Sequence, residues 1–507
     1  MPVTTRKPAA AAKRVARPAA AGAVTVRMYR HGLGDCFLLR LPRDDRSGTF
    51  NILIDCGLIT VADNAREKMR RVVADIALAC ERRIDVVVMT HEHWDHASGF
   101  SPQQAQDLFD HIEIGEVWYA WTEDPENKLG VKLREERAAK QLALAQAVRG
   151  LQAMGTPLAL RRAEGVGRLL GFFGLEAADA ALPAAALKEK VGKSREAFDY
   201  LKNRRDVKTR YLVPGKEAPR MKGVSGVRVY ALGPPQDEGF IKKSAPTKAG
   251  REVYEFASDL AVAESLSCAF LRFEAGADAH HDLDRPFDTS FSRRPDDPQA
   301  RASNKLHELW AATWFDHAQD WRRIDDDWTA AAESLALNLD NHTNNTCLVL
   351  AFEIVGSGRV LLFPADAQVG NWLSWQKLKW RVKDGERINE VTVPDLLQRT
   401  VFYKVGHHGS HNATLRALGL EQMNSEELMA FVPVDRAQAR KNRWNKMPFA
   451  PLVTRLREKT GGRLIMSDDD APPTEGDLGA LPAADRRSFV RTLKSDPKDL
   501  FYEVVFE

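Results

Sequence analysis

The hydrophobic positions divide the chain into two β-rich parts separated by long polar segments. Short apolar runs bounded by turn residues predict strands, which are typically about 5–6 residues long. In the first part the runs cover 24–29, 36–41, 50–55, 84–90 and 113–121, with a helix at 63–82. In the second part they cover 347–354, 359–366, 400–406, 428–434 and 463–467, with a helix at 449–460. Strands that alternate with helices indicate an α/β layered fold.

Two long segments interrupt this pattern. Residues 122–226 are highly charged and mostly helical in their apolar spacing. Residues 227–235 form one strand ending at Gly-Pro-Pro, and residues 236–335 change from irregular to helical. We therefore predict one domain in two halves, 24–121 and 336–507, which share the strand at 227–235 and carry two large insertions.

Composition narrows the class of protein. With 44% hydrophobic and 28% charged residues, the 507-residue chain is typical of a globular protein rather than a disordered one. No run reaches the roughly 18–20 apolar residues of a membrane span, so we expect no membrane association. The five cysteines contain no CxxC pair, which fits a reducing compartment and excludes a cysteine zinc site. We therefore expect a cytoplasmic protein.

Basic charge is concentrated in two places. Residues 1–23 are rich in Ala, Pro, Lys and Arg without apolar periodicity, which predicts a disordered basic tail. The net charge is +3, and the first 24 residues hold five basic residues and no acid, so the remainder carries −2. A nearly neutral body argues against a dedicated duplex-DNA binder. The basic run at 188–210 is either a phosphate contact or, as such runs usually are, a solvated helix face.

The chemistry is concentrated in the segment MTHEHWDHASGF, residues 89–100, directly after an apolar strand. Its candidate ligands are His91, His93, Asp95 and His96. A strand end and its loop can aim several side chains at one point, and imidazole and carboxylate ligands suit zinc or a similar divalent ion. In a chain with 13 histidines this spacing arises by chance only about once in a thousand such chains. The segment therefore predicts a metal site.

HxHxDHxxG after a strand resembles the metallo-β-lactamase superfamily of metal-dependent hydrolases. The resemblance implies a four-layer αββα sandwich with the helical segments as insertions, and one or two metals at the sheet edge. It implies that His91 and His93, with a later histidine, hold the first metal. Asp95 and His96, with a distant histidine, are implied to hold the second, and a further aspartate is implied to bridge the two.

Two later strands resemble parts of the same family. FNILIDCG at 50–57 is similar to the strand whose aspartate, here Asp55, orients the histidine loop. VLLFPADA at 360–367 is similar to the strand that delivers the bridging carboxylate, here Asp366. The family usually has Gly before this aspartate, whereas this chain has Ala365, so the local backbone geometry is open to change.

KVGHHGSHN at 404–412 resembles the KVGHHGS segment of the ComEC-like group of metallo-hydrolases. The resemblance implies that one of His407 and His408 binds metal while the other meets substrate or protonates the leaving group. We expect His407 to be the ligand and His408 to have the catalytic role. His411 is either a surface residue or a substrate contact that protonates the leaving group.

Two further positions leave alternatives open. His342 lies just before the strand at 347–354, as the third histidine does in lactamases, and is expected to complete the first metal site. The adjacent segment NNTCLVL, however, resembles a ComEC-like pattern without a fixed histidine, and the first metal is then weakly held or absent. Asp35 in GLGDCFLL either touches the site or closes a turn.

The resemblance implies a hydrolase that uses a metal-activated water held by Asp95, and its first reading is a phosphodiesterase or nuclease. Two zinc ions are expected, with manganese as the alternative. The other readings are an ester, thioester or lactam hydrolase, and a metal-binding sensor or scaffold without catalysis. The substrate is expected to be a phosphoester or nucleic-acid-type molecule, and the insertions form either a lid or an interface with a partner protein. The sequence does not specify the oligomeric state.

Overall fold

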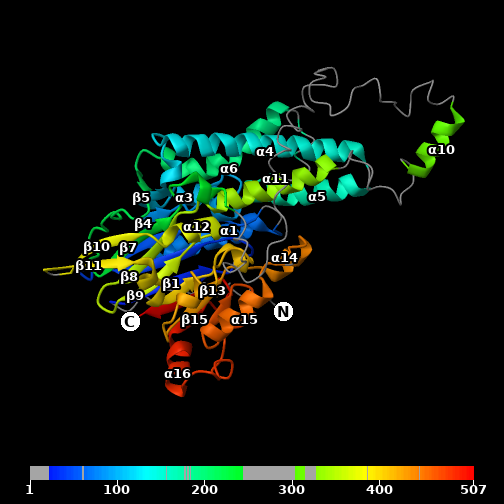
Figure 1. The fold of residues 1–507 in the computed structure, drawn as a ribbon. Helices are drawn as coiled ribbons and strands as arrows, with labels where there is room; N and C mark the ends of the chain where they lie inside the picture. The colour runs from blue at the N-terminus through cyan, green and yellow to red at the C-terminus, as the bar shows by residue number, and fades with distance from the viewer. Residues whose placement is uncertain are drawn as a thin grey trace, which may run out of the picture.

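The computed structural model describes residues 22–243 and 303–507, except 60–61, 156, 176–178, 180–181, 183, 314–326, 385, 445 and 507. Residues 1–21 of the predicted tail and most of the predicted insertion at 236–335 lie outside this part. The fold is mixed α/β, as the sequence predicts, with two main sheets and a separate hairpin (Figure 1).

The first sheet has eight strands in the order β15-β16-β1-β2-β3-β4-β5-β6. They are β1 (Val24–Tyr29), β2 (Phe37–Pro42), β3 (Thr49–Ile54), β4 (Arg83–Val88), β5 (Glu113–Ala120), β6 (Lys208–Leu212), β15 (Leu493–Ser495) and β16 (Phe501–Phe506). From β3 to β6 neighbouring strands run parallel. Because strands inside a parallel sheet are buried on both faces, β3 and β4 end in the buried apolar runs Ile52–Ile54 and Val86–Val88.

The second sheet has six strands in the order β14-β13-β12-β9-β8-β7. They are β7 (Val227–Gly233), β8 (Val349–Ile354), β9 (Arg359–Phe363), β12 (Thr400–Lys404), β13 (Met429–Val432) and β14 (Leu464–Met466). The strands β9, β12, β13 and β14 run parallel, so the segments that follow them meet at one edge of the sheet. The hairpin consists of β10 (Lys379–Asp384) and β11 (Arg387–Thr392).

The two sheets pack face to face through aromatic side chains. Phe37 of β2 meets Phe363 of β9 at 5.8 Å between ring centroids, edge to face. Phe402 of β12 meets Phe506 of β16 at 6.3 Å in the same geometry. Edge-to-face pairs at these distances are favourable contacts in a closely packed core. The edges that carry the polar motifs of the two β-rich parts can therefore face each other.

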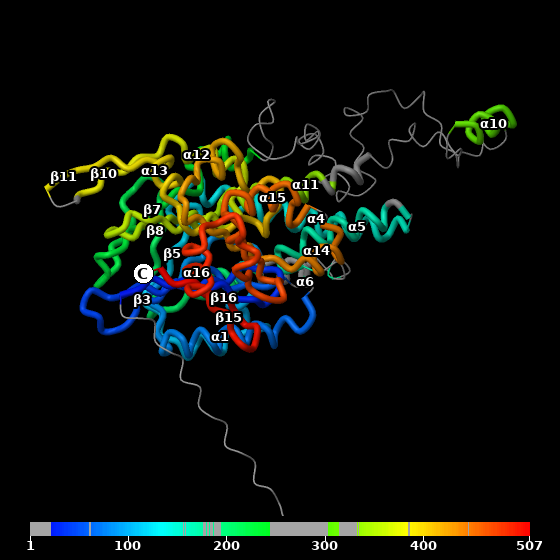
Figure 2. The backbone as a smooth tube through the Cα atoms, turned by 90° about the horizontal axis from the view of Figure 1, so that it is seen from below, coloured from blue at the N-terminus to red at the C-terminus, as the bar shows by residue number. Residues whose placement is uncertain are grey.

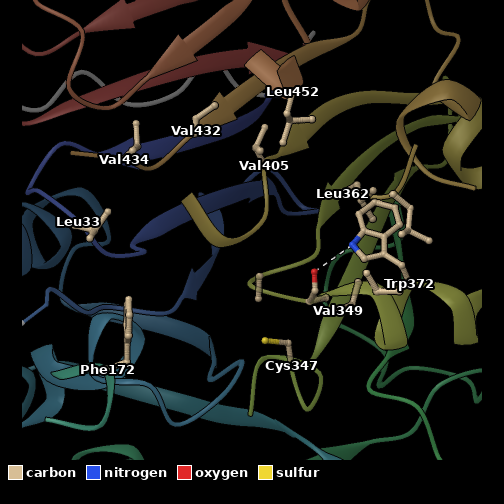
Figure 3. Packing of buried hydrophobic residues seen from close by; sticks show 14 of the residues in the cluster. Leu33, Phe172, Cys347, Val349, Leu362, Trp372, Val405, Val432, Val434 and Leu452 are labelled. Atoms are coloured by element: carbon tan, nitrogen blue, oxygen red, sulfur yellow. Dashed lines mark hydrogen bonds between the residues drawn. The ribbon is translucent and has the colours of Figure 1, made fainter. Parts of the chain in front are cut away.

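Helices cover the outer faces of both sheets. On the first sheet lies α1 (Ala65–Ala79), whose buried residues join the apolar cluster on that face. On the second lie α12 (Val369–Trp375), α13 (Val393–Gln398) and α15 (Ala450–Lys459). Figure 3 shows part of this second cluster, with Trp372 of α12, Leu362 of β9 and Leu452 of α15.

Helices from both predicted insertions form one group beside the sheets (Figures 1 and 2). The group consists of α4 (Lys128–Met154), α5 (Pro157–Leu170), α6 (Ala184–Asn203) and α11 (Asp327–Asn344), with the 3-10 turn η3 (Gly171–Phe173). Buried residues of α4, α5 and α11 share one apolar cluster with the second sheet. The other helices are α2 (Trp94–Ala97), α3 (Gln106–Phe109), α7 (Glu238–Ile241), α10 (Asn304–Thr313), α14 (Arg436–Lys441) and α16 (Ala483–Thr492).

Three features differ from the sequence prediction. Residues 208–212, within a segment predicted as mostly helical, form β6 at the edge of the first sheet. The strands β15 and β16 return from the second half and pair with β1, so this half contributes to both sheets. Helix α11 ends only at Asn344, so residues near His342 that were predicted to precede a strand are helical. No helix in the described part of the chain could cross a bilayer.

Candidate metal centre

The histidine loop follows β4 and runs into the short helix α2. His91, His93, Asp95 and His96 all lie in this loop, and each is at most 1% exposed. The loop closes onto the end of β3 because Gly57 has no side chain. A Cβ atom at Gly57 would lie only 2.3 Å from the carbonyl carbon of Asp95 and the amide nitrogen of His96. This glycine is therefore required for the position of the loop.

Asp55 holds the loop from the end of β3. Its two carboxylate oxygens accept hydrogen bonds from the backbone amide of Thr90 (2.9 Å), the hydroxyl of Thr90 (2.6 Å) and Nδ1 of His96 (2.8 Å). With Nδ1 donating to Asp55, the neutral ring of His96 has its lone pair on Nε2. A carboxylate behind a histidine is the usual arrangement around a metal-binding imidazole.

Asp366 reaches the loop from the second sheet, just after β9. Its Oδ1 accepts hydrogen bonds from the amide of His407 (2.9 Å) and from Lys404 Nζ (3.2 Å). Its Oδ2 lies 3.1 Å from His96 Nε2. Ala365 has a φ of 51°, in the left-handed region that favours glycine. The backbone thus keeps a conformation suited to Gly-Asp although the residue is alanine.

His408 joins the two sheets at this point. Its Nδ1 donates to the carbonyl of Pro433 (2.6 Å), which turns Nε2 toward Asp95 Oδ2, 2.9 Å away, so Nε2 is the atom that a metal would bind. One potential ligand atom from each of Asp95, His96, Asp366 and His408 lies within 4.8 Å of the others. This group of two imidazoles and two carboxylates is buried and could hold a metal ion.

Burial and neighbouring charges separate the histidines into two electrostatic groups. Burial disfavours protonation of His96, yet Asp366 and its neighbouring carboxylates raise its pKa well above the usual range. Burial lowers the pKa of His91 well below the usual range and that of His93 to about 3. His91 and His93 therefore present neutral rings, the form that binds metals.

Many buried polar atoms of this region lack a hydrogen bond within the described part of the chain. They are His91 Nε2, both ring nitrogens of His93, Asp95 Oδ1, His96 Nε2, Asp340 Oδ1, Asp366 Oδ2 and His407 Nε2. Leaving one such group unpaired costs about 1–3 kcal/mol, so this concentration indicates a missing ligand. Imidazole nitrogens and carboxylate oxygens are the donors of zinc and related divalent ions, so these residues fit a metal.

His407 differs from His408 in its hydrogen bonding. Its Nδ1 accepts from Nε2 of Gln368 (3.4 Å), so in the neutral ring the proton is on Nε2 rather than on Nδ1. Burial lowers the pKa of His407 to about 4. The structure therefore brings His408, and not His407, into the four-residue group. His411 is half-buried, and its ring lies 6.0 Å from that of Phe449.

The structure does not bring His342 to this centre. His342 lies in the last turn of α11 and lines a small pocket of about 30 Å³ with Lys140 and Lys242. Burial, followed by these two positive charges, lowers its pKa to about 4. The sequence analysis placed His342 just before a strand, whereas α11 continues through it to Asn344. In a helix, residues two apart lie roughly 200° apart, so Asp340 and His342 face opposite sides.

Three charged residues at the centre were missed or left open. Lys404 is 1% exposed and forms ion pairs with Asp35 and Asp366. Of the two readings of Asp35, contact with the site therefore agrees with the structure. The Oδ1 atom of Asp340 lies 3.9 Å from the Nε2 atom of His93. The buried position of Lys404 before VGHHGS was a readable signal, whereas Asp340 was overlooked beside the more familiar His342.

The family model of the metallo-beta-lactamase superfamily matches residues 30–143. This range contains Asp35, Asp55 and the whole histidine loop, but it ends before the second sheet begins. The superfamily consists mostly of metal-dependent hydrolases, and the buried His and Asp groups of this chain could bind a metal. No curated protein matches the chain.

Proposed function

We propose that this protein is a metal-dependent phosphodiesterase acting on a nucleotide or nucleic-acid-type substrate. The observation that carries the proposal is the convergence of both sheets on one buried point, where Asp95, His96, Asp366 and His408 lie together. Support also comes from the KVGHHGS resemblance of the segment that delivers His408. In this proposal the fold is the four-layer αββα sandwich, with α1 outside one sheet and α12, α13 and α15 outside the other.

A divalent metal bound here supplies Lewis acidity, activates water near neutral pH and offsets the charge of a phosphoryl group. The residues of the chain prepare the site for it. Asp55 and the carbonyl of Pro433 fix the rings of His96 and His408 so that Nε2 is the atom that a metal would bind. Lys404 holds Oδ1 of Asp366, so that Oδ2 remains for the metal.

The two outer histidines have different roles in this proposal. The Nε2 proton of His407 is buried without a partner in the described residues and donates to a substrate oxygen. His411 is half-buried at the edge of the same loop, and it protonates the leaving group. Assigning the ligand role to His408 and the substrate contact to His407 reverses the expectation from the sequence.

An aromatic pair beside the centre favours a substrate with a base. Phe172 of η3 stacks on the half-buried Trp444 at 5.0 Å and lies 6.2 Å from the ring of His407. Phe172 is only 3% exposed, so the half-buried Trp444 is the ring of this pair that can stack a nucleobase, a contact worth about 1–3 kcal/mol. The basic run is a weaker argument, because Arg195, Arg204 and Arg210 already form ion pairs with carboxylates of the chain.

The test compares hydrolysis of bis-p-nitrophenyl phosphate by the wild type, Asp366→Asn and the control Asp477→Asn, whose carboxyl is fully exposed. We expect metal-dependent turnover by the wild type and the control, and loss of at least about 1,000-fold in Asp366→Asn. Turnover of acyl or lactam chromogens instead would favour the acyl-hydrolase reading. Metal binding without any turnover would favour a sensor or scaffold, and equal activity of all three proteins would exclude the proposed site.

A further inference from the structure

A second set of buried donors lies beside the four-residue group. His91 and His93 come from the histidine loop, with ring centroids 4.6 Å apart. Asp340 comes from the last turn of α11 and is 5% exposed. The loop and the helix are far apart in the sequence, yet Asp340 Oδ1 lies 3.9 Å from His93 Nε2. Two different elements therefore deliver three potential ligands to one place.

The hydrogen bonds of these residues leave the relevant atoms unused. Thr90 Oγ1 lies 3.1 Å from His91 Nδ1, while His91 Nε2 has no partner among the described residues. Neither ring nitrogen of His93 has one. Asp340 uses Oδ2 to accept from Asn344 Nδ2 (3.2 Å) and leaves Oδ1 without a partner. A buried carboxylate with one held and one free oxygen has the form of an oriented metal ligand.

The surroundings make this arrangement costly without a cation. The rings of Phe172 and Phe173 lie 5.7 Å and 4.7 Å from that of His93, so this side of the centre is apolar. A buried carboxylate is seldom tolerated without a counter-charge or a metal. Within the described residues, the hydrogen bond from Asn344 is the only one that Asp340 receives.

We propose that His91, His93 and Asp340 would hold a second divalent cation, beside the one at the four-residue group. This inference rests on the proposed function, and it places a carboxylate where a third histidine was expected. The second ion would then have two imidazoles and one carboxylate as protein ligands. Oxygen donors raise the relative affinity for Mn²⁺ or Fe²⁺ against Zn²⁺, compared with a site of three histidines.

The proposal also gives the helical insertion a role in assembling the centre. Leu339, next to Asp340, packs in the cluster that α11 shares with α4 and α5. A ligand on α11 therefore ties the helix group to the histidine loop, and binding of the second ion is coupled to the position of this group.

The test measures metal content and affinity in Asp340→Asn and in His342→Ala, a matched control two residues away on the same helix. Metal per chain is determined by elemental analysis after dialysis, and Mn²⁺ and Zn²⁺ are titrated by calorimetry. We expect two ions in the wild type and in His342→Ala. In Asp340→Asn we expect one ion of unchanged affinity and a second weakened by at least about 100-fold.

A third variant covers the case in which Asp340→Asn does not fold. Asp340→His restores a donor at the same place, and it is expected to bind two ions with a shift in preference toward Zn²⁺. Two ions of wild-type affinity in Asp340→Asn, or loss of one ion in His342→Ala, would overturn the inference. Failure of Asp340→His to shift the preference would also count against it. If the wild type binds no metal at all, the proposed function fails as well, so the two failures are distinguishable.

Discussion

The two halves of the candidate metal centre are supported by different parts of the chain. The carboxylate half, Asp95, His96, Asp366 and His408, stands on strand ends of both sheets and is surrounded by charged partners. The insertion half, His91, His93 and Asp340, lies against the helix group and the aromatic rings of η3. The pKa of His96 is raised in the first, and that of His93 is lowered to about 3 in the second.

The helix group is also joined directly to the histidine loop. Glu92, between the two histidines of the insertion half, forms ion pairs with Arg195 of α6 (2.9 Å) and Arg137 of α4 (3.3 Å). Glu123 pairs with the same two arginines. The histidine loop is therefore fastened to the helix group as well as to the sheet, and disturbing the helix group should affect the insertion half first.

The largest expected effect concerns the carboxylate half. Asp95→Asn removes a negative charge from the four-residue group, and we expect hydrolysis of a phosphodiester to fall by about 1,000-fold, or about 4 kcal/mol in barrier. Asp340→Asn should reduce it less, because the carboxylate half remains complete. The measurement is kcat/KM at saturating metal, with the exposed Asp63→Asn as control. A larger loss in Asp340→Asn than in Asp95→Asn would contradict the comparison.

Metal removal is expected to have the next largest effect. At free metal about 100-fold above Kd, each bound ion contributes about 3 kcal/mol to the free energy of unfolding. Chelation should therefore lower the stability of the wild type more than that of Asp340→Asn, which has one ion fewer to lose. Thermal unfolding with and without chelator gives this difference directly. If chelation lowered the stability of the wild type and of Asp340→Asn equally, the insertion half would bind no ion.

Replacing Glu92 tests the link between the histidine loop and the helix group. Glu92→Gln keeps the shape but removes the charge that pairs with Arg137 and Arg195, and we expect a loss of about 2 kcal/mol in stability. The matched control is Glu164→Gln, because Glu164 pairs with Arg168 on an exposed face, where such pairs contribute about 0–1 kcal/mol. Denaturant unfolding measures both variants. A loss no greater than that of the control would mean that the loop is held by the sheet alone.

The sequence predicts those parts of the fold whose structure depends on neighbouring residues in the chain, and it misses those that depend on distant ones. The strands that precede Asp55, Asp366 and His408 were visible as apolar runs, because burial on both faces leaves a continuous signal. The strand β6 was missed because its residues KTRYL are largely half-buried and polar, as at a sheet edge. The strand β16 pairs with β1 from the other end of the chain, and no local pattern reports such a pairing.

The same distinction applies to the candidate site. The histidine loop is one contiguous segment, and the structure keeps its ligand candidates together. The choice between His407 and His408 depends on Gln368 and on the carbonyl of Pro433, which are distant in the sequence. Likewise, which of Asp340 and His342 faces the centre depends on α11 continuing to Asn344. Sequence motifs thus indicate the donors, while the surrounding hydrogen bonds decide which of them face a metal.

The smallest expected effect concerns Ala365, which precedes Asp366 of the carboxylate half. Its left-handed backbone (φ 51°) costs about 1–2 kcal/mol in a residue with a Cβ, and Ala365→Gly relieves this cost. Glycine also loses a buried methyl group and gains backbone freedom in the unfolded state, each worth about 0.5–1 kcal/mol. The effects nearly cancel, so we expect a stability change within about 0.5 kcal/mol of zero.

Ala430→Gly is the control. Ala430 lies at a buried position in β13 without positive φ, so the substitution has no strain to relieve and should cost about 1.5 kcal/mol in stability. Denaturant unfolding compares the two, and equal losses would show that the chain reaches Asp366 without left-handed strain.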